Sequence, residues 1–125
     1  MSHQPLRVLC ADDNLSLVKV MVEFLTNAGY AVESAGDGLE AWAKVGEDIE
    51  YFDIIVTDHR MPELSGLELV ELLRQARYPG VIVVHASDLS DDEQAAYREL
   101  GIGTIVGKSS GVAALLAAMR AATRS

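Results

Sequence analysis

The sequence has little of what marks secreted or membrane proteins. It contains a single cysteine, Cys10, among 125 residues, so no disulfide can form within the chain. Its longest apolar runs, such as residues 81–84, are far shorter than the roughly 20 residues that cross a bilayer. The first residues have no basic segment followed by an apolar stretch of signal-peptide length. We therefore expect a cytoplasmic protein without a membrane span, with Cys10 in its core.

Positive charge is also scarce. Ten Lys and Arg residues stand against nineteen Asp and Glu residues, which gives a formal net charge of −9. The basic residues are scattered along the chain, whereas a nucleic-acid surface needs them clustered. We expect no direct contact with nucleic acid.

The chain does contain short apolar runs that alternate with helical patterns. Buried strands are predicted at residues 6–11, 31–35, 53–57, 81–84 and 103–107. Apolar spacing, glycines at helix ends and a capping-box signature predict helices between and after them, the last over residues 112–122. The length fits one domain, residues 1–125. Alternation with short connections predicts a doubly wound α/β fold, a parallel sheet with helices on both faces.

Polar side chains follow the predicted strands where ligands bind in such sheets. Asp12 and Asp13 follow the first strand, Asp58 the third, His85 the fourth and Lys108 the fifth. Carboxylates about 5 Å apart repel one another by roughly 3 kcal/mol per pair at an effective dielectric of 20, so a cation is expected. Mg²⁺ suits this oxygen-rich edge. Asp58, held rigidly after a buried strand, is the candidate nucleophile toward a phosphoryl group.

The order and spacing of these residues resemble the signature of bacterial response-regulator receiver domains, including chemotaxis-regulator-like ones. The resemblance rests on Asp12-Asp13, residues 54–66 with Met61-Pro62 and Gly66, and Lys108, and it runs over essentially the whole chain. It implies a flavodoxin-like fold with five helices and a five-stranded parallel sheet of strand order 2-1-3-4-5.

The resemblance also implies a role for each matching residue. Asp58 would be phosphorylated by a histidine kinase or phosphotransfer protein. Mg²⁺ would be bound by Asp13, Asp58 and the backbone carbonyl of Arg60, with Asp12 acting through water. Lys108 would contact the phosphoryl group. The implied function is a phospho-accepting signalling module rather than an enzyme that turns over an outside substrate.

Three positions depart from the family pattern at the places that usually transmit phosphorylation. His85 stands where the family has Thr or Ser, although Ser87 would fill that role if the alignment slipped. Ile105 replaces an aromatic residue, and Ser109 replaces the proline after the lysine. Without that proline a cis peptide is disfavoured, so the turn could aim Lys108 differently. We expect Asp58 to accept a phosphoryl group but the conformational response to be atypical. A protonated His85 donating to the phosphate is a second interpretation.

The last predicted helix has almost no polar face, with Arg120 as its single charge. This composition suggests that the helix meets a downstream protein target or a second protomer. The side chains expected at that contact are Val112, Leu115, Leu116 and Met119.

The remaining histidines and the tryptophan receive simpler interpretations. His3 and His59 have no partner at metal-ligand spacing, so we expect both to be solvated. Trp42 lies at helical spacing with Ala41 and Val45, which favours a packing role.

Other functions remain open at this point. A Mg²⁺-dependent aspartyl-phosphate phosphohydrolase would carry a second Asp two residues after the nucleophile, where Arg60 stands. A flavin binder of the same fold would avoid Asp12 and Asp13 beside its phosphate. A degenerate receiver that serves as a constitutive docking module is favoured by the three altered positions and opposed by the intact acids.

Overall fold

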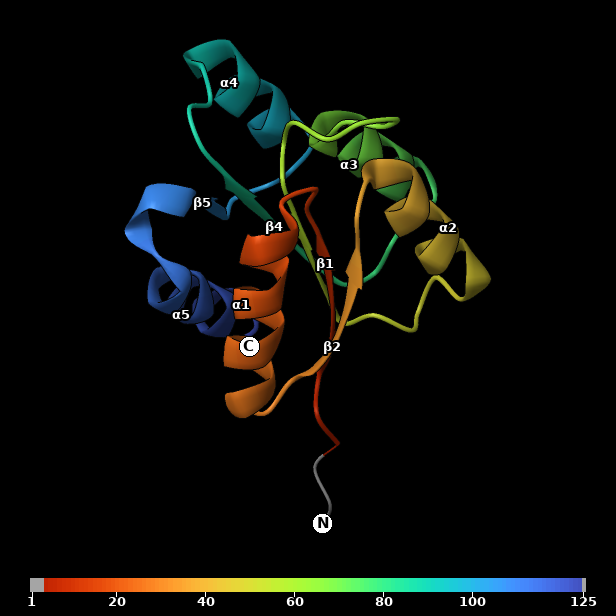
Figure 1. The fold of residues 1–125 in the computed structure, drawn as a ribbon. Helices are drawn as coiled ribbons and strands as arrows, with labels where there is room; N and C mark the ends of the chain where they lie inside the picture. The colour runs from red at the N-terminus through yellow and green to blue at the C-terminus, as the bar shows by residue number, and fades with distance from the viewer. Residues whose placement is uncertain (1–3, 125) are drawn as a thin grey trace.

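Strands and helices alternate along residues 4–124, the part of the chain that a computed structural model describes (Figure 1). The elements in chain order are β1 (Arg7–Ala11), α1 (Leu15–Asn27), β2 (Ala31–Ala35), α2 (Gly38–Glu47), β3 (Ile54–Thr57), α3 (Gly66–Gln75), β4 (Val81–Ala86), α4 (Asp91–Glu99), β5 (Ile105–Gly107), the 3₁₀ turn η1 (Lys108–Ser110) and α5 (Val112–Ala122). Most predicted bounds agree within two residues. The capping box predicted at Ser90 is present, with Glu93 as its second member.

All five strands are parallel and lie in the order β2-β1-β3-β4-β5, which confirms the predicted fold class. The register places Ala11 beside Thr57, Thr57 beside Val84, and His85 beside Val106. The residues that follow β1, β3 and β5 therefore meet at one edge of the sheet.

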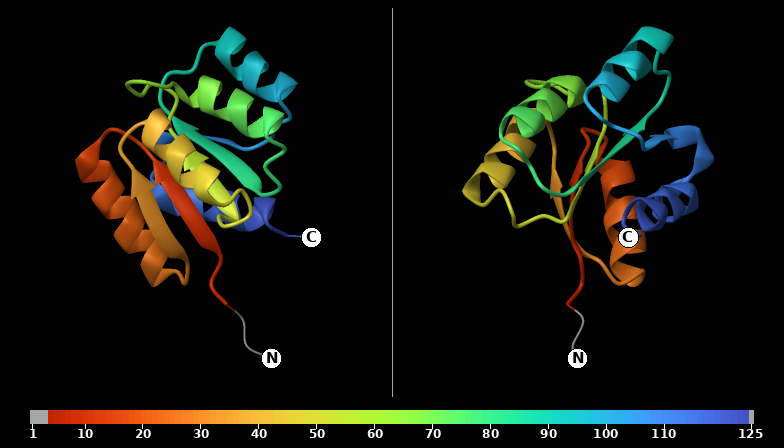
Figure 2. Two further views of the ribbon diagram at one scale, coloured as in Figure 1. Left: turned by 90° about the vertical axis from the view of Figure 1, so that its right-hand side faces the viewer. Right: turned by 180° about the vertical axis from the view of Figure 1, so that it is seen from behind.

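Helices cover both faces of the sheet, with α1 and α5 on one side and α2, α3 and α4 on the other (Figure 2). Because side chains alternate across a strand, Val8 and Cys10 pack under α1 and α5, whereas Leu9 and Ala11 pack under the other three helices. Cys10 is buried and Trp42 packs against the core, as predicted. None of the helices in residues 4–124 combines the length and apolar character that a bilayer span requires.

The prediction that apolar side chains of α5 form a partner surface is wrong. Leu115, Leu116 and Met119 are buried in the core under α1 and the sheet, and Val112 is half-buried against that core. The exposed side of the helix consists of Ala113, Ala117, Arg120 and Ala121. The helix has almost no polar face because alanines occupy most of its outward positions, where their small side chains expose little apolar area.

Candidate functional site

The three predicted acids come together at the carboxyl edge of the sheet. Asp12, Asp13 and Asp58 each offer a carboxylate oxygen, and these oxygens lie within 4.8 Å of one another. Backbone hydrogen bonds extend the strands through this point: the Asp12 N–H donates to Ala35 at 3.0 Å, and the Asp58 N–H donates to Ala11 at 2.9 Å. Asp12 and Asp58 are 1 % and 7 % exposed, whereas Asp13 faces solvent. The sheet thus holds two buried carboxylates and one accessible carboxylate around a common point.

Lys108 directly follows β5 at the same carboxyl edge of the sheet, and its side chain extends into this cluster. Its Nζ lies 2.9 Å from Asp12 Oδ2 and 3.0 Å from Asp58 Oδ2. No cis peptide bond occurs in the described residues, yet the ammonium group contacts both acids. The trans turn expected after Lys108 is present, and with this turn the lysine still contacts both acids.

The charged groups in the cluster, together with burial, shift the pKa values of Asp58 and Lys108. Burial raises the pKa of Asp58, and the negative charge of Asp12 raises it further, although the hydrogen bond from Lys108 opposes both effects. Burial alone would lower the pKa of Lys108, but its hydrogen bonds to Asp12 and Asp58 outweigh burial and raise it. Three carboxylates against one ammonium group leave an excess of negative charge in a confined space.

The cluster fits a hard divalent cation. Its donors are all carboxylate oxygens, two of them buried and one accessible, and Mg²⁺ binds such oxygens through one or two carboxylates while it keeps several waters. Asp13 provides an approach from solvent. The three clustered acids therefore fit a Mg²⁺ ion.

His85 occupies the end of β4 next to this cluster. It is 2 % exposed, and neither ring nitrogen has a hydrogen-bond partner among the described residues. Burial lowers the pKa of His85 and the charge of Lys108 lowers it further, against a smaller opposing effect of Asp12. These effects favour a neutral imidazole, which disfavours the interpretation in which a protonated His85 donates to a phosphate. Ser87 is exposed beyond the strand, whereas His85 is buried as the second-to-last residue of β4.

The other two altered positions lie on the β5 side of the site. Ile105 is half-buried and packs against the core under α2, α3 and α4. Ser109 is exposed within η1. A groove of about 310 Å³ borders Ile105 and runs between β5, α4 and the loop after β4.

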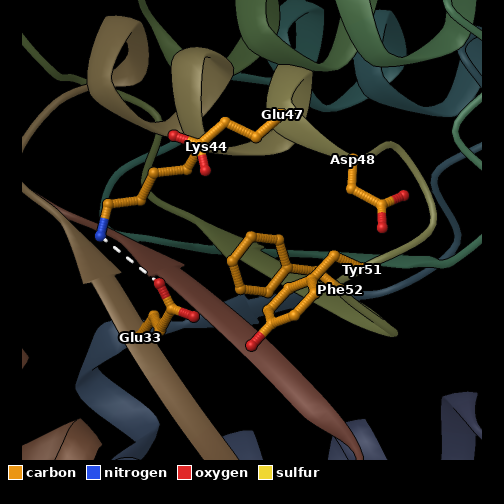
Figure 3. Close-up of a pocket in the computed structure, with 6 residues that line it drawn as sticks. All are labelled: Glu33, Lys44, Glu47, Asp48, Tyr51 and Phe52. Atoms are coloured by element: carbon orange, nitrogen blue, oxygen red, sulfur yellow. Dashed lines mark ion pairs between the residues drawn. The ribbon is translucent and has the colours of Figure 1, made fainter.

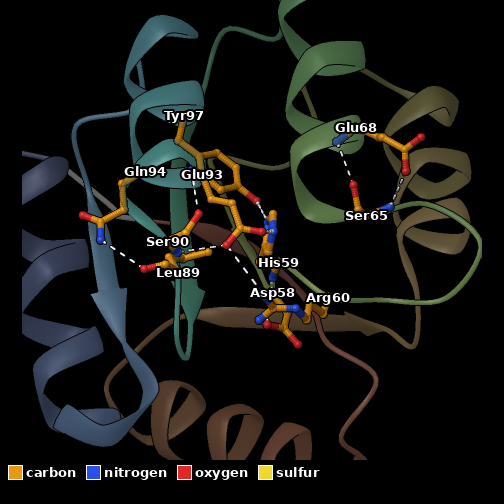
Figure 4. Close-up of polar contacts among 10 residues, drawn as sticks. All are labelled: Asp58, His59, Arg60, Ser65, Glu68, Leu89, Ser90, Glu93, Gln94 and Tyr97. Atoms are coloured by element: carbon orange, nitrogen blue, oxygen red, sulfur yellow. Dashed lines mark hydrogen bonds and ion pairs between the residues drawn. The ribbon is translucent and has the colours of Figure 1, made fainter.

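His59 contradicts the sequence expectation. It is 8 % exposed instead of solvated, and both ring nitrogens contact α4: Nδ1 lies 2.6 Å from the phenol oxygen of Tyr97, and Nε2 lies 2.7 Å from Glu93 Oε2 (Figure 4). The available signal was the spacing of Glu93 and Tyr97, which are four residues apart and therefore share one face of a helix. His3 lies outside the described residues.

A further cavity of about 280 Å³ lies away from the acids, beside the amino end of β3 (Figure 3). Its lining residues are Glu33, Lys44, Glu47, Asp48, Tyr51 and Phe52. Lys44 and Glu33 form an exposed ion pair there at 3.6 Å. Phe52 precedes β3, whereas Asp58 follows its other end, so this cavity is separate from the acidic cluster.

Comparison with known proteins agrees with this geometry. A family model described as the response regulator receiver domain matches residues 8–120. The response regulator MprA of Mycolicibacterium vanbaalenii is 34 % identical over 120 residues, which make up 96 % of this chain and 51 % of that protein. The transcription factor SKN7 of Chaetomium thermophilum is 28 % identical over 102 residues, 82 % of this chain and 13 % of that protein. The chain thus spans about half of MprA and a small part of SKN7.

A solved structure shows the same fold. The chemotaxis protein CheY4 of Vibrio cholerae is 30 % identical, and its structure superposes with a TM-score of 0.85 over 94 % of this chain and 98 % of that chain. The family match covers nearly all of the sheet and its helices, and the acids lie at the carboxyl edge of that sheet. The chain belongs to the response regulator receiver domain family.

Proposed function

We propose that this receiver domain accepts a phosphoryl group on the Asp58 carboxylate. The observation that carries the proposal is the meeting of Asp58 with Asp12, Asp13 and Lys108 at one edge of the sheet. A carboxylate oxygen forms the new bond to phosphorus while the bond from phosphorus to the donor breaks, which gives an acyl phosphate and the free donor. Turnover of an outside substrate is not part of this function.

The residues around Asp58 prepare it for this step. Oδ1 accepts the backbone N–H of His59 at 2.7 Å, and Oδ2 accepts a hydrogen bond from Lys108 at 3.0 Å. These bonds hold the carboxylate in one orientation, which removes the need to order it during reaction. The ammonium group of Lys108 also offsets the negative charge of an incoming phosphoryl group.

A magnesium ion belongs to the proposal. Asp13, Asp58 and the Arg60 backbone carbonyl would hold it, with Asp12 acting through water. When bound, it neutralises charge on the carboxylates and on phosphoryl oxygens. The carboxylate oxygens of Asp12, Asp13 and Asp58, which lie within 4.8 Å of one another, support the part of the three acids in this assignment.

The partner and the response follow from the same interpretation. We propose a histidine kinase or phosphotransfer protein as the phosphodonor in the cytoplasm, and a downstream protein as the target. His85, Ile105 and Ser109 would make the conformational response atypical. The buried imidazole of His85, whose pKa is lowered by burial, supports this, because it differs in size and hydrogen bonding from the hydroxyl expected at that position.

Intact-mass spectrometry tests the central step. Incubation with Mg²⁺ and acetyl phosphate is expected to add about 80 Da, the mass of one phosphoryl group. The adduct should be absent in Asp58→Ala and present in the control Asp48→Ala, whose carboxylate lines the separate cavity. An unmodified wild-type protein under these conditions would favour the second candidate, a docking module that works without phosphorylation.

A further inference from the structure

A buried polar network joins the loop after β3 to helix α4. As whole residues, His59 and Tyr97 are 8 % and 0 % exposed, and His59 contacts both Tyr97 and Glu93 (Figure 4). Their rings also pack edge to face, with centroids 5.5 Å apart. A buried phenol requires a hydrogen-bond partner, and His59 supplies it.

The contacts determine where the protons lie. Burial, then the charges of Asp58 and Glu93, raise the pKa of Tyr97, so its phenol remains protonated and can donate. The Ser90 backbone N–H, then the His59 side chain, lower the pKa of Glu93 to about 2, so its carboxylate can only accept. Tyr97 therefore donates to Nδ1 of His59, and Nε2–H of His59 donates to Glu93. The tautomer with its proton on Nε2 satisfies all three groups.

The backbone of His59 touches the acceptor itself. Its N–H donates to Asp58 Oδ1 at 2.7 Å, and its carbonyl accepts the N–H of Gly66, the first residue of α3, at 2.8 Å. The next residue, Arg60, lies 3.7 Å from the second Glu93 oxygen. Glu93 of α4 thus contacts the side chains of two consecutive loop residues.

We propose that His59 is a positioning residue through which Tyr97 and Glu93 of helix α4 set the placement of the Asp58 carboxylate and of the Arg60 carbonyl. This inference rests on the proposed function. A short loop after a strand leaves several torsions free, and hydrogen bonds at both ends of the His59 ring, together with those at its backbone, restrain them.

Tyr97→Phe is the sharpest test, because it removes one oxygen and leaves the ring. The matched control is Tyr78→Phe, which removes a buried phenol that donates to the Phe52 carbonyl at 2.7 Å, beside the opposite end of β3. Mg²⁺ affinity by isothermal titration calorimetry and the rate of adduct formation with acetyl phosphate should both fall on the order of tenfold in Tyr97→Phe. Both should stay within about twofold in Tyr78→Phe, although the two variants lose similar stability.

Conservative replacement of His59 provides a second measurement. His59→Ala should weaken Mg²⁺ binding and slow adduct formation as Tyr97→Phe does, whereas His59→Asn keeps an acceptor near the position of Nδ1 and should restore part of both. Long-range ¹H–¹⁵N spectra of the wild type should show His59 as the Nε2–H tautomer. Tyr97→Phe should keep this tautomer, because Glu93 still accepts from Nε2, but should shift the Nδ1 resonance, which loses the phenol donor; Tyr78→Phe should leave both nitrogen resonances unchanged.

The outcomes separate this inference from the proposed function. If wild type forms no adduct, the proposed phosphorylation fails, and the Mg²⁺ affinities of Tyr97→Phe and Tyr78→Phe still decide whether His59 positions the acids. Equal Mg²⁺ affinities and rates in these two variants would overturn the positioning role. If His59→Ala does not fold, the phenylalanine pair decides alone.

Discussion

Replacing Lys108 with methionine removes an ammonium group that contacts two carboxylates at 2.9 and 3.0 Å. At that separation and an effective dielectric of 20, each pair attracts by about 5.5 kcal/mol before desolvation is counted. The Lys108 side chain is 20 % exposed, and its own desolvation offsets much of this attraction. Loss of the lysine leaves Asp12 and Asp58 buried without compensation. We expect Lys108→Met to reduce the free energy of unfolding by about 2–3 kcal/mol at pH 7 without Mg²⁺.

The same change should strengthen the response to magnesium. With Lys108 present, Mg²⁺ competes with an ammonium group for the carboxylates, whereas in the variant it meets three uncompensated acids. Tenfold tighter binding corresponds to about 1.4 kcal/mol, and Mg²⁺ should stabilise the variant more than wild type by about that amount when it saturates both. Urea denaturation with and without Mg²⁺ measures both effects.

The matched control is Lys44→Met. Lys44 forms an exposed pair with Glu33 at 3.6 Å, and such pairs contribute about 0–1 kcal/mol, with no expected dependence on Mg²⁺. Equal losses in the Lys108 and Lys44 variants would refute the electrostatic account of the cluster. So would a Lys108 variant that Mg²⁺ stabilises no more than wild type.

Three further measurements probe the site and the core. Because burial raises the pKa of Asp58, this residue's favourable contribution to stability is present below its ordinary pKa of 3.8 and is lost as the pH rises through the raised value. Asp58→Asn should therefore be more stable than wild type at pH 7 without Mg²⁺. The stabilities of the two proteins should converge in acid, as urea midpoints measured across pH would show. Burial and the charge of Asp12 raise the pKa of Cys10 to about 12. A chromogenic disulfide reagent at pH 8 should therefore react with this thiol only as urea unfolds the protein. Rapid labelling of Cys10 in the native protein would contradict this. A Cβ on Gly66 would clash with the Asp58 carbonyl oxygen, so Gly66→Ala should destabilise the protein by about 3 kcal/mol or more. An added Cβ on Gly46 in α2 would meet open space, so Gly46→Ala should stabilise it by about 0.5–1 kcal/mol. Similar denaturation midpoints for the two variants would argue against the close packing at Gly66.

The sequence by itself determined the layering of the protein and the membership of its acidic cluster. Short β-branched runs alternating with amphipathic helices admit few arrangements other than a parallel sheet between helices, since crossover connections have one hand. In such a sheet the carboxyl ends of the strands share one edge, so Asp12, Asp13, Asp58 and Lys108 had to meet there. The bounds of β2 and α5 followed from local pattern alone.

Only the tertiary structure decided what each side chain contacts. His59 carries no local signal of burial, because its partners Glu93 and Tyr97 lie 34 and 38 residues away. From the sequence, the apolar side chains of α5 were predicted to be available to a partner. In the structure, however, α1 and the sheet cover Leu115 and Met119. Burial, proton position and charge pairing depend on neighbours from distant parts of the chain, whereas hydrophobic period and capping depend on residues a few positions apart.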